Sequence, residues 1–193
     1  MDDYPDQDEV RAILGEYEER LERALRAAWD DWLSVPQRSR FRARTRANLV
    51  FDFICLRINE EFDGVAGVRI INSSATMKLL FRDRLLIRFK KANRYGLGAN
   101  IQTQMVLSFI NPQLRFPGFD DVIRVEVCYH LDDLATRVIA LAVTARERFR
   151  LLWSYELAEA APNFALLPTA QDIPQDAEVR MRSVEETEED TSK

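Results

Sequence analysis

The stretch TMKLLFRDRLLIRFKK, residues 76–91, decides the fold. Each half is typical of a β-strand, in which successive side chains point to opposite faces. The pair Asp83-Arg84 between them predicts a hairpin turn. In the second half Arg88 and Lys90 share one face, whereas Lys91 lies on the other. The hairpin could therefore present two neighbouring cations to one ligand.

Two helices precede this hairpin. Over residues 8–33, apolar side chains recur at spacings of three and four, which predicts one long amphipathic helix. Pro36 ends it, and Thr45 can cap a second, broadly apolar helix over 45–62. In the connector 34–44 four arginines alternate with other residues. An extended conformation would place all four on one side.

Further strands follow the second helix and the hairpin. Residues 64–72 and 122–131 predict strands, and 135–145 an antiparallel mate or, given its alanines, a helix. A glycine-containing loop and a helix over 100–110 lie between the two strand groups, and 150–157 predicts a strand or short helix. The fold class is therefore α+β, with two N-terminal helices, an antiparallel or mixed sheet of five to six strands, and one further helix between the two strand groups.

Length and composition predict one domain. The chain has 193 residues, of which 47% are hydrophobic and 31% charged, as in ordinary globular proteins. We expect a flexible terminus over 1–7, one α+β domain over 8–161, and an acidic, disordered tail over 162–193. With an acidic first segment and no long apolar run, we expect a cytoplasmic protein that has no membrane contact.

The net charge of −5 is strongly segregated. Residues 1–33 carry −7, residues 34–94 carry +9, residues 95–161 carry −2 and residues 162–193 carry −5. The basic middle contains 11 arginines and 3 lysines. It could bind an anionic partner, either nucleic acid or an acidic protein. Alternatively, the acidic first helix and tail neutralise it internally.

The densest polar group surrounds the second hairpin strand, the loop after it and the next helix. Amides read base edges and cations hold phosphates, so this group predicts a nucleotide or nucleic-acid site, with Phe89 and Tyr95 available for stacking. A solvated loop beside helix-surface amides is the alternative. The candidate binding residues are Arg44, Arg46, Arg88, Lys90, Lys91, Asn100, Gln102, Gln104 and Gln113.

Known catalytic patterns do not assign a reaction. Gly96 and Gly98 form a G-x-G, but the dinucleotide fingerprint lacks its third glycine, which favours a simple turn. A magnesium nuclease would need a carboxylate where Arg88 stands, and arginine cannot ligate magnesium. His130 is the only histidine, and with two distant cysteines it cannot build a zinc site. We therefore expect neither a metal nor a cofactor, and whether the protein is an enzyme stays open.

Several stretches together resemble a group of bacterial and prophage proteins encoded beside genes for a helix-turn-helix protein fused to an ImmA/IrrE-type metallopeptidase domain. The similarity covers most of residues 10–157. The stretches are RAAWDDW, FRARTRANLVFDFI, LLIRFKKANRYGLGANIQTQ, FINPQ and VEVCYHLDD. The resemblance implies one half of a toxin–antitoxin or phage-defence pair, and it transfers no catalytic residue.

Three hypotheses follow. The first is a component of such a module that binds nucleic acid or a nucleotide through the basic strand–loop–helix face. The second is an interaction protein whose arginines dock an acidic partner, for example a cognate protein from a neighbouring gene. The third is a nucleic-acid hydrolase whose site the sequence does not reveal.

Overall fold

The computed structural model describes residues 4–73, 76–99, 103–114, 116–119 and 121–157. The predicted tail over 162–193 lies outside these residues. The described elements are α1 (Gln7–Leu14), α2 (Glu18–Ser34), α3 (Ala43–Phe62), β1 (Val68–Ser73), β2 (Thr76–Phe81), β3 (Leu85–Lys91), α4 (Gln104–Ile110), β4 (Ile123–Leu131), β5 (Val138–Glu147) and β6 (Arg150–Glu156), with short 3₁₀ turns at Gly15–Tyr17 and Arg38–Arg40.

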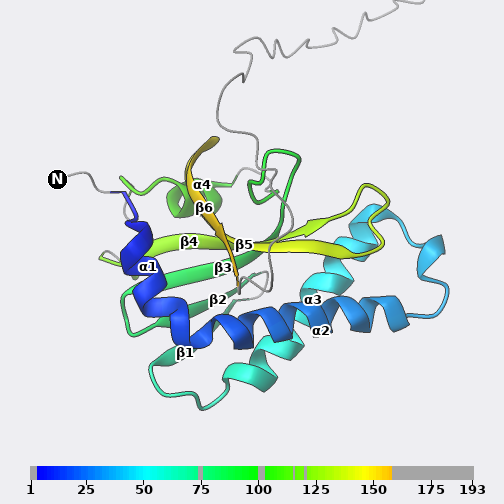
Figure 1. The fold of residues 1–193 in the computed structure, drawn as a ribbon. Coiled ribbons are helices and arrows are strands. Elements are labelled where there is room, and N and C mark those ends of the chain that lie inside the picture. The colour runs from blue at the N-terminus through cyan, green and yellow to red at the C-terminus, as the bar shows by residue number, and fades with distance from the viewer. Residues whose placement is uncertain (1–3, 74–75, 100–102, 115, 120, 158–193) are drawn as a thin grey trace, which may run out of the picture.

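The six strands form one mixed sheet in the order of the sequence. Every neighbouring pair is antiparallel except β3 and β4, which are parallel and are joined by the segment that contains α4. Helices α1 to α3 lie along one side of this sheet and α4 lies on the other (Figure 1). The predicted α+β class, with a further helix between two strand groups, is confirmed. We call the two sides the helical side and the α4 side.

The first predicted helix is divided in two. The side chain of Asp6 caps α1 by accepting a hydrogen bond from the Glu9 amide at 2.8 Å. At Gly15 the chain tightens into a 3₁₀ turn before α2 begins. Glycine is a poor helix former, which favours a change of helix type at this position. The apolar spacing continues through the change, so the spacing alone does not predict it.

The main core lies between the helical side of the sheet and α1, α2 and α3. Alternate residues of each central strand point into it, as the strand period requires. An aromatic group marks one part, where the Tyr17 ring lies 4.9 Å from Phe81 and the Phe62 ring meets Phe81 edge-on at 5.9 Å. Trp29 and Trp32, which lie three positions apart on α2, are buried in the same core.

The α4 side has a smaller core. Leu80 and Leu86 from the hairpin pack there against Phe109 and Ile110 of α4 and against Phe116 in the loop that follows. Thr103 caps α4 by accepting from the Val106 amide. This apolar group covers only part of the sheet. Beside it, polar side chains occupy four buried positions of the strands, Arg88, Glu126, Thr144 and Arg146.

Candidate functional site

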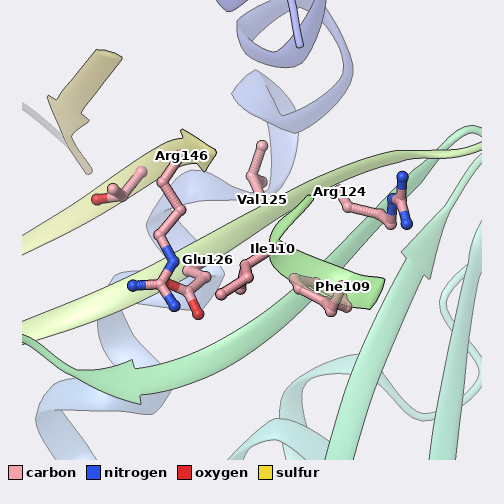
Figure 2. Close-up of a pocket in the computed structure, with 7 residues that line it drawn as sticks. Phe109, Ile110, Arg124, Val125, Glu126 and Arg146 are labelled. Carbon is pink, nitrogen blue, oxygen red and sulfur yellow. The ribbon is translucent and has the colours of Figure 1, made fainter. Parts of the chain in front are cut away.

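A buried triad of charged side chains occupies the centre of the α4 side. Glu126 of β4 stands opposite Arg88 of the parallel strand β3, and Arg146 of β5 approaches from the other side (Figure 2 shows Glu126 and Arg146). Arg88 Nε donates to Glu126 Oε1 at 2.9 Å, and Arg146 Nε lies 3.2 Å from Glu126 Oε2. All three residues are buried. One carboxylate therefore joins two guanidiniums across three strands.

The glycine loop after β3 is fastened to this triad. The Gly98 amide donates to Glu126 Oε2 at 3.2 Å, and Arg146 Nη1 donates to the Gly98 carbonyl at 3.3 Å. An ideal Cβ at Gly98 would lie 2.5 Å from Glu126 Oε2, so only glycine fits without displacement. The second glycine of the G-x-G pattern therefore holds the loop against the sheet.

Burial governs the electrostatics of this region. It lowers the pKa of Arg88, and the adjacent Glu126 carboxylate opposes that shift. Burial, followed by repulsion from Arg88, also lowers the pKa of the half-buried Lys90. Arginine stays protonated in proteins, so the triad holds two positive charges and one negative charge.

The hollow beside the triad is small. It encloses about 160 Å³ at most, below the range of about 300–1,000 Å³ that is usual for small-molecule sites. It cannot admit a nucleotide in this arrangement. Its lining is Phe109, Ile110, Arg124, Val125, Glu126, Thr144 and Arg146 (Figure 2).

The expected cationic face on β3 is only partly open to solvent. Arg88 does share a side with Lys90, as predicted, but its guanidinium is buried against Glu126 rather than open to solvent. Lys91 is half-buried on the opposite side of the strand. Of the two aromatic rings considered for stacking, Phe89 is buried in the main core and Tyr95 is exposed, with the Arg94 guanidinium 4.7 Å above it.

The other predicted residues that the structure describes lie in α4, in the loop after it and in α3. Gln104 begins α4 and Gln113 follows it, and both are exposed. Arg44 and Arg46 belong to the first turns of α3, on the helical side of the sheet. Asn100 and Gln102 lie outside the described residues.

Internal ion pairs account for part of the basic middle. Arg57 donates to Asp31 of α2 at 2.6 Å, and the guanidinium of Arg82 pairs with Glu16. Arg84 likewise pairs with Glu9. In these three cases, carboxylates of the N-terminal helical region neutralise arginines of the basic middle, as the alternative interpretation expected.

A second basic group has no such compensation. It consists of Arg38, Arg40, Phe41, Arg42, Arg44 and Arg46, which we call the arginine segment. All but the half-buried Arg46 are exposed, and none of its arginines pairs with a carboxylate in the described parts of the chain.

The arginine segment joins α2 to α3. Gln37 takes a left-handed conformation with φ 57°, and a 3₁₀ turn follows over Arg38–Arg40. After this turn, Phe41 and Arg42 are extended, and α3 begins at Ala43. The expectation of one extended row of arginines is therefore wrong, because turn and helix geometry replaces it. Thr45 is not the cap; Arg42 holds that position without a side-chain hydrogen bond.

The arginine segment lies at the end of the molecule where α2 ends and β4 turns into β5 (Figure 1). Trp29 Nε1 of α2 donates to the carbonyl of Thr136 in that turn at 3.3 Å. Burial raises the pKa of Tyr129, near the end of β4, to about 12, and the nearby Arg46 guanidinium opposes the shift. The residues predicted from the sequence include Arg44 and Arg46 but not Phe41. The sequence Arg40-Phe41-Arg42 could have indicated this aromatic residue between two cations.

Comparison with known proteins identifies no relative. No protein-family model matches the chain, and no significant match was found among curated proteins or solved structures. Within the described ranges, no helix is both long and apolar enough to cross a membrane. The same residues contain no group of three or more histidine, cysteine, aspartate or glutamate side chains placed to hold a metal ion.

Proposed function

We propose that the protein binds nucleic acid through the arginine segment. The observation that carries the proposal is the concentration of five arginines within residues 38–46, unpaired with carboxylates in the described structure. No aspartate or glutamate lies between Asp31 and Asp52 in the sequence. An uninterrupted positive field of this kind suits a polyphosphate, whose charges recur at short intervals.

The helix geometry strengthens this argument. The N-terminus of a helix carries a partial positive charge, so each cation there costs about 0.3–1 kcal/mol. The first turn of α3 contains arginine and no acidic residue, and its N-cap is Arg42. These arginines do not stabilise the helix that carries them. A bound phosphate would interact favourably with both the guanidiniums and the helix end.

An acidic protein partner is the competing proposal for the same segment. Binding of nucleic acid and binding of an acidic protein differ in how the affinity depends on salt concentration. Nucleic acid releases condensed counterions when phosphates are neutralised, which gives a linear dependence of log K on log salt. The resemblance to proteins encoded beside metallopeptidase genes motivates a wider proposal, that this binding serves a bacterial toxin–antitoxin or phage-defence module.

The test is titration of a fluorescein-labelled 20-nucleotide RNA and its DNA equivalent, followed by anisotropy at several salt concentrations. We expect Arg42→Ala/Arg44→Ala to weaken binding and to reduce the salt slope by about 1.4, at about 0.7 per lost single-strand phosphate contact. The matched control is Arg148→Ala/Arg150→Ala, which removes two exposed arginines at the β5–β6 turn.

Three outcomes would overturn the proposal. They are no binding at 50 mM salt, equal losses in the two double variants, or a salt slope that does not change in Arg42→Ala/Arg44→Ala. If nucleic acid does not bind but a protein co-purifies and is released by Arg42→Glu/Arg44→Glu, the segment serves an acidic partner instead. Intact probe after incubation with magnesium would separate binding from hydrolysis.

A further inference from the structure

Phe41 is the exposed aromatic residue within the arginine segment. Its side chain is 44% exposed between Arg40 and Arg42. From this position we infer that the segment binds single-stranded nucleic acid, with one unpaired base stacked on the Phe41 ring and the flanking phosphates on the arginines. The inference rests on the proposed function and names its substrate class.

The ring is held in place from beneath. Its centroid lies 6.3 Å from that of Trp32, with the two planes tilted by 45°. Trp32 is itself buried in the main core and lies on the last turns of α2. The Phe41 amide donates to the Arg38 carbonyl at 3.1 Å, which fixes the backbone at the same point. A ring that is already oriented loses less conformational freedom when a base stacks on it.

The exposed part of this ring is not covered by a cation. Among the described residues, four arginine or lysine side chains lie over aromatic rings, and Phe41 is not one of those rings. Tyr95 differs, since Arg94 already occupies one of its faces. Of the two arginines beside Phe41, Arg40 donates to the Gln37 side chain at 3.1 Å, whereas Arg42 has no side-chain partner among the described residues. Arg42 can therefore contact a phosphate while the ring contacts a base.

A second Arg-Phe-Arg sequence provides a contrast. Phe149 is 64% exposed between Arg148 and Arg150 at the β5–β6 turn. Phe149 lies two positions after Glu147, and its basic run contains fewer arginines than the run around Phe41. Its ring makes no contact with another aromatic ring among the described residues. Support by Trp32 and the longer run of arginines therefore distinguish Phe41 from an equivalent local sequence.

The expected ligand follows from what a base needs in order to stack. In a duplex each base is already stacked and paired, so an aromatic side chain on the surface finds no free base face. A single strand offers both its base faces and its phosphates, and aromatic stacking combined with cationic contacts is the usual mode for such ligands. A preference for single strands is thus the signature of this arrangement.

The experiment compares a labelled dT20 strand with a 20-base-pair duplex, using the full chain at one salt concentration. We expect tighter binding of dT20. Phe41→Leu should weaken dT20 binding by about five- to a hundredfold, the range for loss of one base–aromatic contact, and should leave duplex binding unchanged. Phe41→Tyr should bind as the wild type does, and Phe149→Leu is the matched control.

Circular dichroism and thermal unfolding should show that Phe41→Leu keeps its fold, because nearly half of this side chain is already in solvent. Equal binding of strand and duplex, or equal effects of Phe41→Leu and Phe149→Leu, would overturn the inference and leave the proposed function standing. If neither ligand binds, the proposed function fails as well.

Discussion

Replacing Glu126 by glutamine removes the carboxylate that contacts both buried guanidiniums. The substitution keeps the size of the side chain, so its effect reports charge. Breaking a buried ion pair by removing one partner costs about 3–5 kcal/mol, because the remaining charge stays buried. Glu126 serves Arg88, Arg146 and the Gly98 amide together, which places the expected loss of unfolding free energy within that range.

Urea unfolding followed by tryptophan fluorescence measures this loss. For a chain of this length, about 3–5 kcal/mol corresponds to a fall in melting temperature of about 6–20 °C. Glu156→Gln is the control, since Glu156 is exposed on β6 and surface substitutions of this kind change stability by less than about 0.5 kcal/mol. The triple variant Arg88→Met/Glu126→Gln/Arg146→Met removes the unpaired charges as well, and it should recover most of the loss.

The triple variant also covers the case in which Glu126→Gln does not fold. A loss of less than about 1 kcal/mol in Glu126→Gln would refute the reasoning, given the cost expected for a broken buried pair. A triple variant no more stable than the single one would refute it too, because uncompensated charge would then not be the cause.

Three further predictions concern stability and reactivity. Gly98→Ala should destabilise the fold by about 1–3 kcal/mol through overpacking, whereas Gly15→Ala, with open space around it, should stabilise by about 0.4–1 kcal/mol in the same urea assay. A hydrogen bond from Arg57 lowers the pKa of Asp31, so this contribution to stability is complete above the ordinary pKa of 3.8 and is lost as the pH falls through the lowered value. Asp31→Asn should therefore weaken the pH dependence of unfolding in acid, and an unchanged dependence would contradict the assignment. Burial raises the pKa of Cys55 to about 11, so mass spectrometry should show slow alkylation by iodoacetamide at pH 8 and a rate that rises towards pH 11.

The fold was predictable to the level of its elements because short-range periodicity encodes it. Alternation identified the hairpin and β4, and the three-and-four spacing identified the N-terminal helical region. Two features were beyond that signal. The break at Gly15 leaves the apolar spacing intact, and the parallel pairing of β3 with β4 depends on contacts across the loop and α4 between them. Periodicity also placed Arg88 and Lys90 on the same side.

The candidate site was less predictable, because a charged residue in a sequence does not show what it faces. Arg88 looked like a ligand for an external anion, and its actual partner is Glu126, 38 positions further along the chain. Glu126 itself stands in an alternating strand where a solvent-facing carboxylate would give the same pattern. Only the register of β3 against β4 brings the two together.

Charge compensation differs among the arginines that the structure describes. Where an arginine is buried, a carboxylate must accompany it, and the Arg88–Glu126 pair satisfies that requirement. At the surface a carboxylate is optional, yet Arg57, Arg82 and Arg84 have one. The arginine segment has none among the described residues and begins a helix whose dipole disfavours cations. Two members of the segment have local hydrogen-bond partners: Arg38 donates to the Leu33 carbonyl of α2 at 2.7 Å and Arg40 to the Gln37 side chain at 3.1 Å. The lack of a carboxylate beside the arginines, together with the unfavourable helix end, is the observation on which the proposed anion binding rests.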